Sequence, residues 1–306
     1  MKTSNLIAAA ALLLSSCAAG PPQIAITIDD LPVHAPYPPG INSLEVNRQM
    51  AAALKAEGVP ATTFVNAVNV TDPPTMEALE DWRAAGFVLG NHTWSHRHLS
   101  DMSIAEFESE LTKNEPVLEK LGSGSDWRWF RYPFLDEGKD EMQRIAARGV
   151  LAKHYYRVAD VTMSFSDWQF TPAYARCAAA GNKAALEELE QIYMDVAKEN
   201  IGVARETARK LYGRDIPYVL LMHVSAMSAQ MMPRVIQLYR NAGFRFVTLE
   251  RAESDPAYRS DTDLSAQPRP SQWDLAKKKG VNLPLAPDPT ARLAEMCPGG
   301  PTATNP

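Results

Sequence analysis

The sequence predicts an α/β fold in which parallel strands alternate with helices in one domain, at residues 22–250. Short apolar segments alternate there with segments of helical periodicity, and no stretch of linker composition divides them. With 45% apolar and 22% charged residues, the 306-residue chain has the composition of a globular protein that can bury a core. Its formal charge of −5 argues against a nucleic-acid partner, because such proteins usually carry a basic excess.

Seven predicted strands are short and rich in apolar, β-branched or aromatic residues. They lie at residues 24–28, 62–65, 87–89, 128–132, 156–162, 218–222 and 244–249. Six predicted helices lie at residues 44–57, 77–85, 103–121, 141–148, 184–212 and 233–241. Gly58, Gly86 and Gly149 follow three of these helices as stop signals, and Ser103 with Glu106 forms a capping box at the start of another.

Residues 1–16 predict a cleaved export signal, because Lys2 precedes an apolar run that is too short to span a bilayer. The segment Leu14-Ser15-Ser16-Cys17 resembles the lipobox of bacterial lipoproteins. This resemblance implies a lipid anchor at Cys17 and a location on the periplasmic face of a membrane, and Ala18 points to the outer membrane. A plain signal peptide with an incidental cysteine is the alternative.

The C-terminal residues 251–306 are rich in Pro and polar residues and predict an irregular tail that wraps the domain or is partly disordered. Cys177 and Cys297 remain after removal of the signal. They could pair in an oxidising compartment. Sequence alone does not show whether they come within bridging distance, so both outcomes stay open.

Two polar clusters directly follow predicted strands, where parallel α/β folds usually place their sites. Asp29 and Asp30 end an apolar strand, where two carboxylates are costly unless something binds them, although paired Asp residues often only cap a turn. His92 and His96 have a spacing at which both imidazoles can reach one metal ion. His98 is interpreted as an exposed loop residue.

Further polar candidates lie later in the chain, at Arg131, at Asp167-Trp168 and at His223, which ends a predicted strand. Taken singly, each has an ordinary explanation, such as a surface salt bridge or a hydrogen-bonded structural histidine. His34, in the Pro-rich loop at residues 32–40, is given no role.

The combined order of these motifs resembles the polysaccharide deacetylase family, the NodB-like carbohydrate esterases of family four. The motifs are Thr27–Asp30, Gly90–His96, Arg131–Phe134, Asp167–Trp168 and Leu221–His223. The resemblance implies an irregular (β/α) barrel of about seven parallel strands. Residues 184–212 would be a helical insertion that buttresses the barrel or shapes the substrate cleft. The sequence departs from the family pattern at Ile28 and Leu31, where Phe and Gly are usual, and at Phe134, where Tyr is usual.

The resemblance also implies a metal site and a base. Asp30, His92 and His96 would bind a divalent metal, most often zinc, with cobalt or another divalent ion as alternatives. Asp29 would be the general base that takes a proton from metal-bound water, and Arg131 would hold Asp29 and stabilise its charge. Physical chemistry agrees, because zinc lowers the pKa of bound water to about 7 and three protein ligands leave room for water and substrate.

The remaining implied roles concern the substrate. The backbone N–H of Phe134 would help to stabilise the oxyanion, and His223 would protonate the leaving amine. Asp167 would orient His223, while Trp168 and Leu221 would line the acetyl or sugar pocket. An amine is a poor leaving group unless it is protonated, which is why an acid is needed.

The sequence therefore predicts a metal-dependent hydrolase that removes acetyl groups from an N-acetylated polysaccharide or oligosaccharide. The expected partner is a glycan, and no protein partner is predicted. One alternative is an O-deacetylase of the acetylxylan-esterase type. Another is a non-catalytic carbohydrate-binding lipoprotein, and a third is a metal-carrier lipoprotein. The sugar, its linkage and the oligomeric state stay open.

Overall fold

The computed structural model of the chain describes residues 20–122, 124 and 126–299. The predicted export signal and the predicted lipidation site Cys17 lie outside the described residues. Within the described part of the chain, no helix has both the length and the apolarity that a membrane span requires.

The strands form one sheet, and every strand pairing in it is parallel, as the alternation of strands and helices predicts. Seven strands follow the order β5-β4-β3-β2-β1-β7-β6, and the short β8 pairs with the first two residues of β1. Their bounds are β1 (Gln23–Leu31), β2 (Ala61–Val65), β3 (Val88–Asn91), β4 (Trp129–Phe130), β5 (Arg157–Val158), β6 (Met163–Ser164), β7 (Tyr218–His223) and β8 (Arg245–Phe246).

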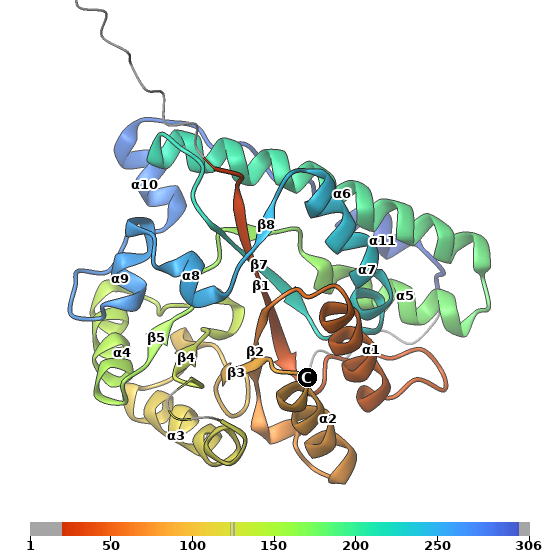
Figure 1. Cartoon of the computed structure of the whole chain (residues 1–306), viewed down its shortest axis with the longest axis horizontal. Coiled ribbons are helices and arrows are strands. Elements are labelled where there is room, and N and C mark those ends of the chain that lie inside the picture. The colour runs from red at the N-terminus through yellow and green to blue at the C-terminus, as the bar shows by residue number, and fades with distance from the viewer. Residues whose placement is uncertain (1–19, 123, 125, 300–306) are drawn as a thin grey trace, which may run out of the picture.

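The sheet curls into an incomplete barrel, because its two edge strands, β5 and β6, follow one another in the chain. Only residues 159–162 join them. The five backbone steps from β5 to β6 reach at most about 18 Å, whereas seven strands laid flat would separate the two edges by about 29 Å. The sheet must therefore bend round, with helices on its outside (Figure 1), and the predicted barrel of about seven parallel strands is confirmed.

Helices connect most of the strands and cover the outside of the barrel (Figure 1). The helices are α1 (Ser43–Ala56), α2 (Pro73–Ala84), α3 (Ile104–Leu121), α4 (Glu141–Lys153), α5 (Phe170–Ala179), α6 (Lys183–Tyr212), α7 (Ala226–Asn241), α8 (Leu249–Glu253), α9 (Arg259–Thr262), α10 (Gln272–Lys279) and α11 (Thr290–Glu295). The predicted capping box at the start of α3 is present, with Ser103 and Glu106 bonded reciprocally.

Several elements differ from their predicted bounds. The strand predicted at 156–162 is two short strands on opposite edges of the sheet, because the chain crosses there from β5 to β6. Helix α4 continues past Gly149 to Lys153, since Val150 and Leu151 bury their side chains and outweigh the helix cost of glycine, about 1 kcal/mol. Helix α5 has no counterpart among the predicted elements.

The tail contains short helices separated by irregular backbone, and side chains tie it to the barrel. The Arg269 guanidinium pairs with Asp160, which lies in the β5–β6 connection. The Arg148 Nη2 on α4 donates to the carbonyl oxygen of Ser260 at 2.6 Å. The β5–β6 connection is therefore covered by the C-terminal segment.

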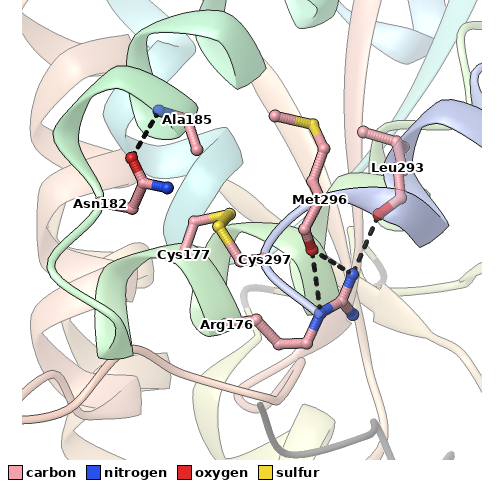
Figure 2. Close-up of a disulfide and its surroundings, with 7 residues drawn as sticks. All are labelled: Arg176, Cys177, Asn182, Ala185, Leu293, Met296 and Cys297. Atoms are coloured by element: carbon pink, nitrogen blue, oxygen red, sulfur yellow. Dashed lines mark hydrogen bonds between the residues drawn. A yellow bond between two sulfur atoms is a disulfide. The ribbon is translucent and has the colours of Figure 1, made fainter. Parts of the chain in front are cut away.

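A disulfide fastens the end of the tail to α5, as Figure 2 shows. Cys177 and Cys297 have Cα atoms 5.2 Å apart and are separated by 120 residues in sequence. The neighbouring Arg176 donates through Nη2 to the carbonyl oxygens of Leu293, at 2.9 Å, and Met296, at 3.1 Å. The pairing that the sequence left open is thus present in the structure.

Candidate active site

A bulge in β1 turns the carboxylates of Asp29 and Asp30 toward the same site. Side chains of a regular strand alternate between faces. The pairing of β1 with β2 slips between Ile28 and Leu31, and Asp30 has a φ of 68°. A left-handed residue in a bulge re-aims its side chain. As a result, the Nε2 atom of His92 lies 3.6 Å from Asp29 Oδ2 and 3.4 Å from Asp30 Oδ1.

His92 and His96 face one another across a tight turn that follows β3. Thr93 and His96 have φ values of 64° and 55°, so the backbone folds back on itself. The two imidazole centroids are 4.8 Å apart. The buried Asn66 donates to the carbonyl oxygen of His92 at 2.5 Å, and Asn91 accepts from the Thr93 N–H at 2.9 Å. Buried amide side chains therefore hold the turn.

The three predicted metal ligands converge. One candidate ligand atom from each of Asp30, His92 and His96 lies within 4.8 Å of the others, and Asp30 Oδ1 is 3.2 Å from His96 Nε2. The His92 Nδ1 lies 2.8 Å from the carbonyl oxygen of Arg131 and donates to it, which leaves the Nε2 lone pair for a metal. Asp30 Oδ1 is buried without a hydrogen-bond partner among the described residues. A divalent cation would satisfy that oxygen, so this donor set fits zinc or a similar ion.

The charges around the three candidate ligands favour the protonation states in which they can bind a metal. Burial alone would raise the pKa of Asp30, but the hydrogen bond from His34 and the nearby His92 and His96 imidazoles hold it well below its usual range. Burial lowers the pKa of His96 to about 4, although the Asp30 carboxylate opposes this shift. At neutral pH Asp30 is therefore ionised and His96 is neutral, as metal coordination requires.

Asp29 is buried beside Arg131, and both side chains are almost inaccessible to solvent. The Arg131 Nη1 lies 3.3 Å from each Asp29 carboxylate oxygen. Arg131 itself is held by the carbonyl oxygen of Ala159, which accepts from Nε at 2.8 Å, and by the hydroxyl of Thr27, which accepts from Nη2 at 3.1 Å. The guanidinium thus compensates the buried charge of Asp29 and sets its orientation.

His223 ends β7 next to Asp29, since these two residues are register partners on adjacent strands. Its Nδ1 donates to Asp167 Oδ1 at 2.8 Å, and its backbone N–H donates to Asp167 Oδ2 at 2.8 Å. Burial alone would lower the pKa of His223, but the charge and hydrogen bond of Asp167, with Asp30 and Asp29, raise it to about 9. His223 is therefore protonated at neutral pH.

Asp167 is fully buried and has partners beyond His223. The Ser228 hydroxyl donates to Asp167 Oδ2 at 2.7 Å, and the Tyr193 hydroxyl on α6 donates to Ser228 Oγ at 3.2 Å. The Tyr193 ring also packs edge-to-face against Phe170, with the centroids 5.0 Å apart. Helix α6, the predicted insertion, thus buttresses the turn that carries Asp167.

The three remaining predicted residues are Phe134, Trp168 and Leu221. Phe134 is half-exposed in a left-handed conformation, with a φ of 56°, and its ring centroid is 4.4 Å from that of His96. Trp168 is 49% exposed and directly follows Asp167. Leu221 is the register partner of Thr27, whose hydroxyl contacts Arg131, so it lies on the same face of the sheet as the site.

His34, to which the sequence assigns no role, belongs to this site. The His34 Nδ1 lies 2.7 Å from Asp30 Oδ2, and its ring centroid is 5.0 Å from that of His223. A lone histidine in a Pro-rich loop carries no recognisable spacing, so no sequence signal placed it here. His98, in contrast, is far more exposed and pairs with Asp136 rather than with a predicted ligand.

Comparisons with known proteins agree with this architecture. The polysaccharide deacetylase family profile matches residues 18–153. A peptidoglycan-N-acetylglucosamine deacetylase of Bacillus cereus is 29% identical over 112 residues, which are 37% of this chain and 36% of that protein. A chitin deacetylase of Colletotrichum lindemuthianum is 25% identical over 154 residues, which are 49% of this chain and 54% of that protein.

Solved structures share the fold at low sequence identity. The chitin deacetylase from the same fungus has a TM-score of 0.54 at 20% identity, over 76% of this chain and 88% of that one. A pseudoenzyme of the CE4 family, solved as a mutant with restored enzymatic activity, has a TM-score of 0.54 at 17% identity, over 76% of this chain and 67% of that one. Residues 18–153 thus match the polysaccharide deacetylase family, and the chain shares the fold of these two solved structures. The matched segments span about a third and about half of the two curated relatives.

Proposed function

We propose that the chain is a metal-dependent hydrolase that removes acetyl groups from an N-acetylated glycan. The observation that carries the proposal is the convergence of Asp30, His92 and His96, with Asp29 and His223 beside them. The family and its two deacetylase relatives support the same reaction class. Asp30, His92 and His96 would hold the ion, and zinc suits this donor set.

When bound, the ion would lower the pKa of a water molecule and polarise the acetyl carbonyl. Asp29 accepts a proton from the attacking water, and Arg131 keeps its carboxylate aligned at 3.3 Å. Because Asp30 lies in the bulge and Asp29 faces Arg131, the two adjacent carboxylates can divide the ligand and base roles. The backbone N–H of Phe134 contributes to the oxyanion site.

His223 supplies the proton for the leaving nitrogen. Its Nδ1 proton is engaged by Asp167, so the proton on Nε2 is the one available for transfer. The raised pKa of about 9 keeps that proton in place at neutral pH. Trp168 and Leu221 line the pocket for the acetyl group or the sugar ring, since Trp168 is half-exposed beside Asp167.

The protein would act outside the cytoplasm, as a lipoprotein anchored through Cys17. The disulfide between Cys177 and Cys297 supports an oxidising compartment, because such bonds are rare in the cytosol. Radiolabelled palmitate incorporation that is lost in Cys17→Ala would test the anchor. Export with cleavage at another residue would contradict it.

The test of function is acetate release by the purified, zinc- or cobalt-loaded chain. The substrates are chitooligosaccharides, peptidoglycan fragments, poly-N-acetylglucosamine and acetylxylan. We expect release from at least one N-acetylated glycan. Release from acetylxylan alone would favour an O-deacetylase, and inertness on all four and on simple acetyl esters would overturn the enzymatic proposal.

A further inference from the structure

We infer that His34 is a positioning residue for the metal site, which it serves by holding the ligand Asp30 in its coordinating orientation. The inference rests on the metal site within the proposed function and goes beyond it by assigning a residue outside the family motifs. His34 Nδ1 lies 2.7 Å from Asp30 Oδ2, and the side chains of His34 and Asp30 are 17% and 13% exposed.

The two carboxylate oxygens of Asp30 have different partners. Oδ1 lies 3.4 Å from His92 Nε2 and 3.2 Å from His96 Nε2 and has no hydrogen-bond partner among the described residues. Oδ2 lies on the other branch of the carboxylate and accepts from His34. A carboxylate can only accept, so the His34 Nδ1 carries the proton in this contact. The bond therefore leaves Oδ1 free for an ion and fixes the rotation of the carboxylate group.

The conformation of Asp30 explains why such support is needed. Its φ of 68° is in the left-handed region, which non-glycine residues seldom adopt. Such a conformation persists only when surrounding contacts over-determine it. The slip in β1–β2 pairing begins after Ile28, so the ladder to β2 does not hold Asp30 itself.

The loop that carries His34 is itself held by hydrogen bonds. The His34 N–H donates to the Tyr37 hydroxyl at 3.0 Å. The buried Asn47 on α1 donates to the carbonyl oxygen of Pro32 at 2.8 Å and accepts from the Trp82 indole at 2.8 Å. The loop is thus anchored to α1 and α2, and this anchoring places the His34 imidazole against Asp30. Partners of this kind orient metal ligands, and their loss typically weakens metal affinity by about 10–100-fold.

The test compares two substitutions in the full chain by titration with zinc and with cobalt. His34→Leu keeps the bulk but removes the donor, and His34→Asn keeps a donor, since Nδ2 of Asn occupies the place of Nδ1 along the side chain. We expect His34→Leu to weaken zinc affinity about 10–100-fold and to change the cobalt visible spectrum. We expect His34→Asn to restore most of the affinity.

The control is His154→Leu. His154 is 20% exposed and pairs with Glu108 at 2.8 Å, so it matches His34 in burial and in having a carboxylate partner. The substitution His154→Leu should leave metal affinity unchanged. The inference would be overturned if His34→Leu bound zinc as tightly as wild type. It would also be overturned if His34→Asn and His34→Leu lost zinc affinity equally while their metal-free melting temperatures stayed unchanged. If wild type binds zinc but releases no acetate, only the proposed reaction falls, and failure of wild type to bind zinc or cobalt would overturn both.

Discussion

Asp29 on β1 is the register partner of His223 on β7, so the proposed base and acid come from adjacent parallel strands. The N–H of Val224 donates to the carbonyl oxygen of Asp29 at 3.2 Å, which extends the ladder past both residues. The preceding partners, Ile28 and Met222, are fully buried. The spacing of the two proposed catalytic groups is therefore set by the sheet.

Replacement of the base is the most direct test of the chemistry. Asp29→Asn keeps the size of the side chain but cannot accept the proton, so turnover should fall by about 10²–10⁴-fold. Zinc affinity should stay within a few-fold of wild type, since Asp30, His92 and His96 are intact. The measurements are acetate release at saturating metal and calorimetric zinc titration.

The matched control for this substitution is Asp195→Asn, on the exposed face of α6, where the carboxylate bonds only Gln191 among the described residues. It should retain full turnover. Unchanged turnover in Asp29→Asn would remove Asp29 from the base role.

The pH dependence of turnover should report His223. A general acid must be protonated, so activity is lost as the pH rises through its pKa, which is about 9. Asp167 makes the largest of the contributions that raise this pKa. Asp167→Asn should therefore move the alkaline limb of the pH–activity profile from about 9 toward the ordinary histidine value of 6.5 and leave the acidic limb unchanged. An alkaline limb that does not move would show that another group donates the proton.

The strand–helix alternation and the site motifs could be predicted because they depend on local sequence. The parallel α/β arrangement follows from apolar strands and glycine-terminated helices, while the barrel is implied by the resemblance of the motif series, and the capping box at Ser103 forms as its spacing predicts. The predicted ligands Asp30, His92 and His96 do converge. The bulge that orients Asp30 could not be predicted, because nothing in local composition distinguishes a regular strand end from one whose pairing slips.

Features that depend on distant parts of the chain also escaped prediction. His34 reaches the site only because α1 anchors its loop through Asn47. Ser228 reaches Asp167, and Tyr193 reaches Ser228, only through the packing of α6 and α7. The split of the predicted strand 156–162 depends on closure of the sheet. Each is a tertiary contact between segments that no local pattern links.

The buried pair of Arg131 and Asp29 should be a large determinant of stability. Arg131→Met leaves the Asp29 charge buried without its partner, and breaking a buried pair in this way costs about 3–5 kcal/mol. The double variant Asp29→Asn/Arg131→Met leaves no uncompensated charge. Its free energy of unfolding in urea should lie above that of Arg131→Met alone. Additive losses from the two substitutions would instead show that the residues do not interact.

The disulfide between Cys177 and Cys297 should stabilise the fold without taking part in the chemistry. It closes a loop of 120 residues, and such a crosslink typically contributes about 2–4 kcal/mol by restricting the unfolded chain. Reduction of wild type should lower the midpoint of urea unfolding, and the double variant Cys177→Ala/Cys297→Ala should show a similar midpoint with or without reductant. Zinc affinity should be unchanged, because the ligands lie on β1 and the turn after β3. An equal midpoint for oxidised and reduced wild type would show that α5 and the tail stay docked through other contacts, such as that of Arg176 with Met296.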